Sequence, residues 1–380
     1  MESVKDIFEL IDELECSGLS DELKSKNINY YLQEKARECG IPYHGHFELT
    51  PFCNLNCKMC YVHLQKDQVT ERSILTSKDW IELMQQSIDA GMLVSSLSGG
   101  ECLTYPWFDE VYMYLKSKGM MITVLTNGVL LNNKRIEFFK KNLPNIIQVS
   151  LYGYSEETYE KVTGNRVFDT VVNNIIKAKE AGLPIRLSIT PNRYISGDIK
   201  KVIKLAFDLD LPYTINLGLM TPRSDTGRQL NDHDISLDDY IEVFKYNRAL
   251  NNEVVKSQKI VPFVKTLKQE FSESGLKCGA GRSVFSINWD GTMSPCSQMN
   301  SILTHPREVG FLNAWNDINQ KASKYPRFKQ CDECVYSKAC NFCAAENEKM
   351  GSRYLLDVRW CQKTWKMVEN GLRKIELICD

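Results

Sequence analysis

The first chemically suggestive feature of the chain is a group of three cysteines within eight residues. Cys53, Cys57 and Cys60 have the spacing C-x3-C-x2-C. Thiolates in one short loop can converge on one metal centre, and soft sulfur ligands favour an iron–sulfur cluster or zinc. A structural zinc ion needs four protein ligands, and a nearby histidine could supply the fourth: His44, His46 or His63. The spacing predicts a metal centre and leaves its metal open.

A second group of cysteines lies in the last third of the chain: Cys278, Cys296, Cys331, Cys334, Cys340, Cys343 and Cys361. The chain has 14 cysteines, and none lies between Cys102 and Cys278. Reducing compartments disfavour disulfides, so this clustering indicates metal ligation. Seven cysteines are too many for one four-ligand zinc site.

Composition sets broad limits on the partners of the chain. Its 380 residues are 43% hydrophobic and 25% charged, with a formal net charge of −1, so we expect no nucleic-acid or anionic-membrane partner. No apolar run approaches the ~18 residues that a membrane span needs. The first six residues include acids where a signal peptide would be basic, and we therefore expect a cytoplasmic protein.

The elements that must position the first cysteines follow a strand–helix alternation over residues 44–235. The predicted strands are Gly45–Thr50, Val94–Ser98, Ile122–Thr126, Ile146–Leu151, Ile185–Thr190 and Tyr213–Leu219. The helical patterns between them are Ser77–Ala90, Trp107–Lys118, Asn133–Lys141, Phe168–Ala181 and Ile199–Leu209. This rhythm predicts parallel β/α units with the site at the carboxyl ends of the strands. Periodicity alone does not distinguish a barrel from an open sheet.

The remaining segments suggest four domains or regions. Residues 1–43 are expected to form a helical extension, residues 44–235 the strand–helix unit, and residues 236–274 a charged helical bridge. From residue 275 to 380 the rhythm breaks down and cysteines and turns become prominent. We expect a small domain there that is held together by metal and ends in a helix.

Polar motifs stand at the ends of three of the predicted strands. Ser98-Gly99-Gly100-Glu101 ends the second strand, Thr126-Asn127-Gly128 the third, and Ser150 the fourth. Glycine permits close backbone approach, and a carboxylate suits an ammonium group. Each motif alone is usually just a turn, but all of them follow the cysteine loop in order.

Together these motifs resemble the radical S-adenosylmethionine superfamily, over roughly residues 44–220. The resemblance implies an α/β fold, a partial (β/α)6 TIM-like barrel with a C-terminal Cys-rich auxiliary-cluster domain. It also implies a [4Fe-4S] cluster on Cys53, Cys57 and Cys60, with one iron left for S-adenosyl-L-methionine. In that family one electron cleaves S-adenosylmethionine and releases a 5′-deoxyadenosyl radical. The resemblance favours iron–sulfur over zinc.

The resemblance also implies contacts to S-adenosylmethionine. Gly99, Gly100 and Glu101 are expected to bind the methionine ammonium, and Arg166 the methionine carboxylate. Ser150 is expected at the ribose or carboxylate, and Met59 near the adenine. Thr126 and Asn127 complete the implied set. Packing in the loop for Met59 and a solvated surface position for Arg166 are the alternatives.

The downstream cysteines resemble the SPASM extension, which holds two auxiliary [4Fe-4S] clusters. By that resemblance one cluster is ligated by Cys331, Cys334, Cys340 and Cys361, and the other by Cys278, Cys296 and Cys343. Two departures stand out: the Cys340–Cys343 spacing is x2 where the family usually has x3, and residues 279–295 contain no cysteine. One auxiliary cluster is thus expected to have an open iron. That iron could bind a substrate thiolate, or water or another side chain could close it.

SPASM-type enzymes mostly modify peptides or proteins. The resemblance favours a ribosomal peptide maturase, an oxidoreductase that forms a thioether or carbon–carbon cross-link with electrons from a flavodoxin or ferredoxin. Only residues 1–43 precede the first strand, so leader recognition is expected to need a separate leader-binding protein or another surface. The first alternative is an anaerobic sulfatase maturase that makes formylglycine, although Ser297 stands where those enzymes have an acid. An iron–sulfur electron-transfer protein is the alternative from another class.

Overall fold

The computed structural model describes residues 21–62, 64, 74–216, 234–252, 271–272, 275–350 and 354–373. His63, residues 1–20 of the expected N-terminal extension and most of the expected helical bridge lie outside the described residues. No helix in the described ranges is long and apolar enough to cross a membrane.

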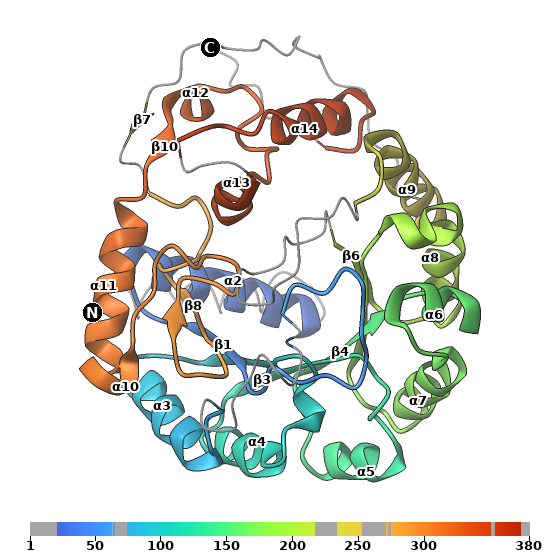
Figure 1. Ribbon diagram of the computed structural model, residues 1–380, viewed down its shortest axis with the longest axis horizontal. Helices are drawn as coiled ribbons and strands as arrows, with labels where there is room; N and C mark the ends of the chain where they lie inside the picture. The colour runs from blue at the N-terminus through green and yellow to red at the C-terminus, as the bar shows by residue number, and fades with distance from the viewer. Residues whose placement is uncertain are drawn as a thin grey trace.

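The core of the molecule is a curved sheet of mostly parallel strands (Figure 1). The first six strands are β1 (His44–Glu48), β2 (Val94–Ser98), β3 (Met121–Thr126), β4 (Ile146–Leu151), β5 (Ile185–Ile189) and β6 (Tyr213–Ile215). Each pairs in parallel with the next along the chain. The predicted partial (β/α)6 TIM-like barrel is confirmed, and the strand bounds differ from the predicted ones by a few residues.

Helices cover the outer face of this sheet (Figure 1). They are α3 (Ser77–Asp89), α4 (Phe108–Ser117), α5 (Asn133–Lys141), α6 (Glu156–Thr163), α7 (Phe168–Glu180), α8 (Ile199–Asp208) and α9 (Leu237–Leu250). Helix α2 (Asp21–Cys39) is not part of this layer and runs across the middle of the view in Figure 1. Short 3-10 turns, η3 (Cys102–Thr104) and η4 (Arg193–Asp198), follow β2 and β5. Thr76 and Asp79 form a capping box at the start of α3, which fixes where that helix begins.

Strand β1 shows how the pleat separates the two faces of the sheet. Phe47 is fully buried and its ring contacts Trp80 of α3 edge to face. Successive side chains of a strand point to opposite faces, so His44, His46 and Glu48 point to the concave side. The inside of the barrel is therefore polar along β1, and the apolar core lies between strands and helices.

The cysteine-rich part is continuous with the barrel. Strand β8 (Val284–Ile287) pairs in parallel with β1, and β9 (Met293–Ser294) pairs antiparallel with β8. Phe285 of β8 contacts Phe47, and also Phe311 and Trp315 of α11 (Phe311–Ser323). Residues from the region expected to form a separate domain thus supply a seventh parallel strand and its covering helix.

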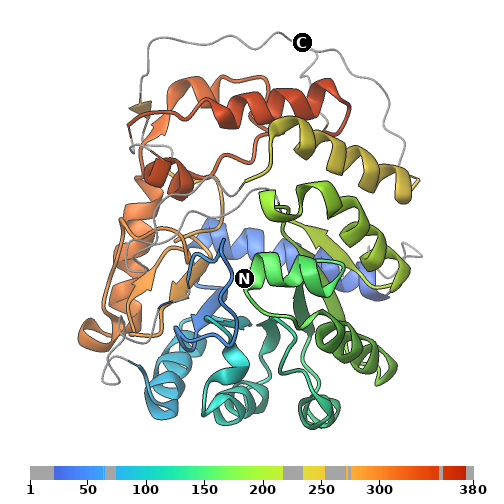
Figure 2. The same cartoon turned by 45° about the vertical axis from the view of Figure 1, so that its right-hand side comes forward.

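The rest of the cysteine-rich part lies beyond this strand. Its elements are β7 (Phe271–Ser272), α10 (Pro306–Val309), β10 (Arg327–Phe328), α12 (Lys329–Asp332), α13 (Ala344–Met350) and α14 (Arg359–Glu369). Figure 2 shows α14 running beside α9 above the barrel, and buried Met367 of α14 packs with Tyr240 and Ile241 of α9.

The end of β2 lies against the cysteine loop at a distance that only glycine permits. A Cβ on Gly99 would lie 2.4 Å from the Thr50 carbonyl oxygen, and one on Gly100 would lie 2.3 Å from the Phe52 carbonyl oxygen. The φ of Gly99 is +142°, which disfavours any other residue. In return, Gly100 N–H donates to Thr50 O at 2.8 Å and holds the loop to the strand.

We expect Gly100→Ala to lower the free energy of unfolding by about 3 kcal/mol, because the new methyl group forces the two backbones apart. The measurement is denaturant unfolding of the variant beside wild type. Gly197→Ala is the matched control, because nothing lies within 4 Å of its Cβ position. Equal losses in the two variants would contradict the contact between β2 and the loop.

Candidate functional site

The first cysteine loop is held between the end of β2 and the end of α6. Glu101 N–H donates to Phe52 O at 2.8 Å, and Asn56 N–H donates to Thr163 O at 3.0 Å. Lys58 N–H donates to Val162 O, one residue earlier in α6, at 2.9 Å. Helix α6, which the sequence analysis did not predict, therefore uses its free carboxyl-terminal carbonyls to position the loop.

The three thiols of this loop face one buried phenol, Tyr152. Burial raises the pKa of the Tyr152 hydroxyl well above its usual range, and the neighbouring thiols of Cys57, Cys60 and Cys53 add to the increase. Burial also raises the pKa of Cys53 to about 12, with further contributions from Glu101 and Cys60. The structure thus brings the three cysteines together at the carboxyl ends of the strands.

Nitrogen donors point at the sulfur of Cys53, which suits a metal-bound thiolate. Leu55 N–H donates to Cys53 Sγ at 3.4 Å, and Asn127 Nδ2 donates to it at 3.6 Å. N–H donors to sulfur stabilise its anionic form and are one way in which proteins tune iron–sulfur clusters. Three converging thiols with such donors fit the predicted [4Fe-4S] cluster.

Glu101 is a buried carboxylate that joins the ends of β2 and β3. Its Oε1 accepts from Thr126 Oγ1 at 2.8 Å and from Leu103 N–H at 3.1 Å, and its Oε2 accepts from Asn127 N–H at 2.7 Å. The side chain is 1% exposed, and burial raises its pKa while these donors lower it. Two carboxylate oxygens offer about four acceptor positions, so one remains on Oε2 for the predicted ammonium contact, which stays a prediction.

Asn127 links this carboxylate to the cysteine loop. Its backbone N–H binds Glu101, while its side-chain Nδ2 donates to Asn54 Oδ1 at 2.7 Å as well as to Cys53. Its Oδ1 accepts from Val129 N–H at 3.0 Å, which fixes the amide orientation. The predicted residues of the second and third strand ends, Glu101, Thr126 and Asn127, therefore form one connected network with the loop.

The other predicted contacts are placed unequally. Met59, which lies in the loop between Cys57 and Cys60, is buried in the core. Ser150 hydrogen-bonds the hydroxyl of Tyr152. Arg166 lies on the surface, 57% exposed, and its Nη1 pairs with Glu160 Oε2 at 3.0 Å. Its guanidinium is committed to that partner here. Tyr152 was missed by the sequence analysis, although its position two residues after Ser150 at the end of β4 could have suggested it.

The zinc alternative gains no support from the described residues. His44 Nε2 hydrogen-bonds Ser96 Oγ at 2.8 Å, and His46 Nε2 hydrogen-bonds Ser98 Oγ at 2.9 Å. Both histidines are thus engaged by β2 inside the barrel. Within the part of the chain that the structure describes, no three His, Cys, Asp or Glu side chains are arranged to hold a single metal ion. A cubane differs because each thiolate binds its own iron.

A second group of thiols lies around α14. Burial raises the pKa of Cys361 to about 12, and the neighbouring thiols of Cys331, Cys340 and Cys334 add to the increase. Cys331, with a pKa raised to about 11 mainly by burial, has Cys340 and Cys334 beside it as well. These four cysteines are the ones that the resemblance assigns to one auxiliary cluster, and their ligation stays a prediction.

A third group joins Cys278, Cys296 and Cys343. Burial raises the pKa of Cys296 to about 11, with contributions from the thiols of Cys278 and Cys343. A backbone hydrogen bond joins the segments that follow Cys278 and precede Cys296, because Gly281 N–H donates to Pro295 O at 3.3 Å. Cys340 and Cys343, whose spacing departs from the family pattern, therefore belong to different groups.

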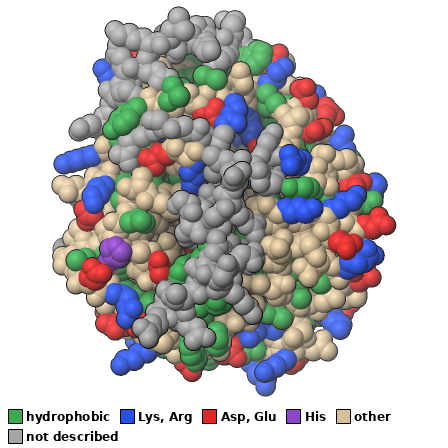
Figure 3. All heavy atoms as spheres, viewed as in Figure 1, with side chains coloured by type: hydrophobic (Ala, Val, Ile, Leu, Met, Phe, Trp, Pro, Cys, Tyr) green, Lys and Arg blue, Asp and Glu red, His purple; other side chains and the backbone are tan. Residues whose placement is uncertain are grey.

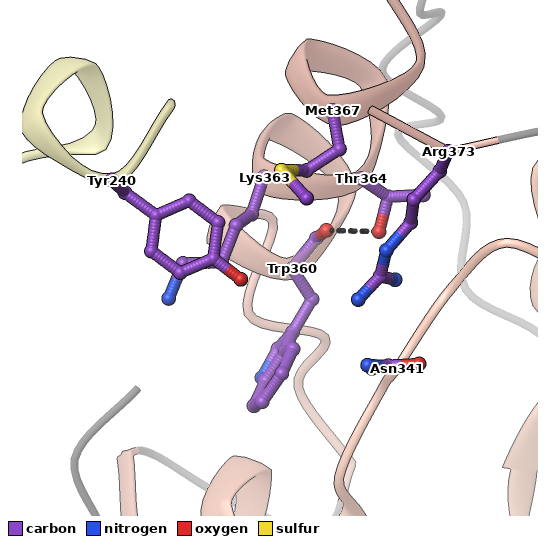
Figure 4. A pocket seen from close by; sticks show the side chains of 7 residues that line it. All are labelled: Tyr240, Asn341, Trp360, Lys363, Thr364, Met367 and Arg373. Carbon is purple, nitrogen blue, oxygen red and sulfur yellow. Dashed lines mark hydrogen bonds between the residues drawn. The ribbon is translucent and has the colours of Figure 1, made fainter. Parts of the chain in front are cut away.

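A small pocket borders the second group (Figure 4). It is a shallow, open depression between α9 and α14, lined by Tyr240, Asn341, Trp360, Lys363, Thr364, Met367 and Arg373. Asn341 follows Cys340 and Trp360 precedes Cys361, so the pocket lies beside these cysteines and not at the first loop. Over the face in Figure 3, basic and acidic side chains are interspersed, in keeping with the small net charge.

Comparison with known proteins identifies relatives of the same architecture. Residues 47–206 match the family model described as the radical SAM superfamily. The chain is 23% identical over 336 residues to an AdoMet-dependent heme synthase of Methanosarcina barkeri (strain Fusaro / DSM 804). The alignment covers 83% of this chain and 95% of that protein. It is also 23% identical over 325 residues to the antilisterial bacteriocin subtilosin biosynthesis protein AlbA of Bacillus subtilis (strain 168), with 81% and 68% covered.

Among solved structures, Streptococcus suis SuiB bound to S-adenosylmethionine superposes with a TM-score of 0.67 at 18% identity, covering 95% of this chain and 88% of SuiB. SuiB bound to its precursor peptide SuiA gives a TM-score of 0.64, with 91% and 82% covered. These likenesses establish the fold.

The partly buried histidine His44 predicts a pH dependence of stability. Burial, with His46 nearby, lowers its pKa from 6.5 to about 4 in the folded chain. The unfolded state then binds the proton first as the pH falls, so stability present above pH 6.5 is lost progressively towards pH 4. We expect His44 to account for about 2 kcal/mol of the loss between pH 7 and pH 5.

Denaturant unfolding of wild type and His44→Gln at both pH values measures this contribution. His305→Gln, at an exposed histidine, is the control. A wild-type difference that His44→Gln leaves unchanged would contradict the assignment.

Proposed function

The chain is a member of the radical S-adenosylmethionine superfamily, of its SPASM subgroup, and we propose that it is a maturase that cross-links a ribosomally made peptide. The bond formed would be a thioether or a carbon–carbon bond. The observation that carries the proposal is that the cysteines fall into three separate thiol groups, one at the strand ends and two in the cysteine-rich part.

The enzyme uses a [4Fe-4S] cluster and S-adenosylmethionine, and auxiliary clusters accompany them in the subgroup. When bound, these cofactors supply a 5′-deoxyadenosyl radical that removes a hydrogen atom from the substrate. Cys53, Cys57 and Cys60 would hold the cluster that cleaves S-adenosylmethionine. The second and third thiol groups would hold the auxiliary clusters, since a cross-link formed by net loss of two hydrogens requires electron acceptors.

The protein's own task in this reaction is to position and to shield. Glu101 and Asn127 hold the cysteine loop against β2 and β3, so its thiols stay in place while substrate binds. Met59 of the loop is buried and Tyr152 lies beside the thiols, and in this proposal both would help to keep water away from the radical. Excluding water protects a reactive radical from side reactions.

Peptide modification is favoured over the alternatives by particular residues and relatives. AlbA is described as a bacteriocin biosynthesis protein, and SuiB binds a precursor peptide. Ser297, in place of an acid, follows Cys296 and counts against formylglycine formation. A simple electron carrier has no need of a barrel that matches a radical SAM family model over 160 residues, from 47 to 206.

Partners beyond the peptide remain part of the proposal. A flavodoxin or ferredoxin would supply the reducing electron, because S-adenosylmethionine cleavage needs one electron from outside. A separate leader-binding protein and a cytoplasmic location stay predictions from the sequence.

We expect the anaerobically reconstituted enzyme to bind about twelve irons per chain and to form 5′-deoxyadenosine from S-adenosylmethionine and dithionite. Replacing Cys53, Cys57 and Cys60 by Ala should leave about eight irons and abolish 5′-deoxyadenosine. Cys361→Ala, in the second group, is the control and should lose iron but keep the cleavage. Stoichiometric zinc without 5′-deoxyadenosine would overturn the proposal.

With a candidate precursor peptide, we expect a product lighter by one pair of hydrogens, ~2 Da, and 5′-deoxyadenosine in step with it. Cys361→Ala should still form 5′-deoxyadenosine but lose the product, because the electron acceptor is damaged. Mass spectrometry follows both. Conversion of a peptide Cys or Ser to formylglycine would instead identify a sulfatase-type maturase. Formation of heme, with no change in any peptide, would instead favour the activity for which the heme synthase relative is named.

A further inference from the structure

The third thiol group has one cysteine fewer than the second. It contains Cys278, Cys296 and Cys343, and the other four cysteines between residues 275 and 361 lie in the second group. A [4Fe-4S] cubane has four irons, and each thiolate binds one of them. A cluster on the third group therefore needs one more ligand, from the protein or from outside.

A buried carboxylate lies beside this group. Cys343 directly precedes α13, and Glu346 is the third residue of that helix, a position from which a side chain can reach back to the residue before the helix. Glu346 is 7% exposed. The backbone N–H of Glu346 bonds the thiol of Cys343, and the Glu346 carboxylate lies near enough to interact electrostatically with the same thiol.

Glu346 forms an ion pair with Lys349, which also contacts a residue close to Cys296 in the chain. Lys349 Nζ lies 3.7 Å from Glu346 Oε1, and the two side chains are 16% and 9% exposed. The same ammonium donates to Gln298 Oε1, and Gln298 N–H in turn bonds the thiol of Cys296. A buried carboxylate is costly unless it is paired, and this lysine supplies the partner while linking Glu346 to the chain segment that carries Cys296.

Gln298 provides a second sign that something binds here. Its side chain is 5% exposed, and within the described residues its Nε2 has no hydrogen-bond partner. Buried donors are normally satisfied. The amide lies two residues after Cys296, where a cluster sulfide could accept from it.

We propose that the Glu346 carboxylate is the fourth ligand of the auxiliary cluster held by Cys278, Cys296 and Cys343. The proposal rests on the proposed function, which places a cluster on this group. Carboxylate oxygen is an established ligand of protein iron. It follows that this cluster has no iron open to a substrate thiolate, so the substrate does not coordinate it during the reaction.

Glu346 also stands at a position where a glutamate or glutamine can cap the start of a helix. Glu346→Gln separates the two roles, because glutamine keeps the capping hydrogen bond and loses the anionic ligand. Glu346→Cys restores an anionic ligand. Glu348→Gln is the matched control on the same helix, where Glu348 accepts from the Tyr325 hydroxyl at 2.6 Å.

The test uses the reconstituted chain with Cys53, Cys57 and Cys60 replaced by Ala, so that only auxiliary clusters contribute to the spectra. EPR and Mössbauer spectra and iron content are recorded before and after mild ferricyanide oxidation. We expect Glu346→Gln to lose about one iron per chain and to show a [3Fe-4S] signal. Glu346→Cys and Glu348→Gln should retain their iron.

Free cysteine is the second probe of the same variants. The parent is the chain in which Cys53, Cys57 and Cys60 are Ala and Glu346 is kept. Free cysteine should change the spectrum of Glu346→Gln and leave the spectrum of this parent unchanged. A parent spectrum that shifts with cysteine, or a Glu346→Gln chain that behaves as Glu348→Gln, would overturn the ligand assignment alone. A parent chain that binds no iron at the third group would show that the cluster assignment is wrong, and this proposal would fall with it.

Discussion

The carboxylate of Glu101 is the interaction on which the active end of the barrel depends. A buried anion is unfavourable unless donors surround it, and here a hydroxyl and two backbone N–H groups do so. Hydrogen bonds to a charged group are worth ~2 kcal/mol each, and every one of these donors would be stranded without it. Because the donors come from η3 and from the end of β3, the carboxylate fixes two neighbouring strand ends relative to each other.

This arrangement also positions the cysteine loop. Asn127, held by Glu101, reaches the loop at Asn54 and Cys53, while the glycines before Glu101 let the backbones of β2 and the loop touch. Helix α6 closes the other side with its last carbonyl groups. Three thiols that would repel each other as anions are thus held together before any metal binds, which lowers the cost of assembling a cluster.

The cysteine-rich part shares the sheet of the barrel through β8, and its cysteines divide into a group of four and a group of three. The group of four lies under α14 and beside the pocket at α9. The group of three lies where α13 meets the chain after β9, with Glu346, Lys349 and Gln298 around it. The group of three lies next to the barrel sheet, because Cys296 follows β9 by two residues, whereas the group of four follows β10, which pairs with β7 in a separate two-stranded sheet.

The sequence by itself determined the six strands, most of the barrel helices and the residues at the strand ends, because these follow from periodicity and local spacing. It did not reveal that β8 joins β1, since the pairing of strands some 240 residues apart leaves no local pattern. Only the tertiary structure placed Tyr152 beside the thiols, left Arg166 on the surface and brought Lys349, the partner of Glu346, to Gln298 near Cys296. Proximity between distant segments is decided by packing and burial, and spacing along the chain does not encode it.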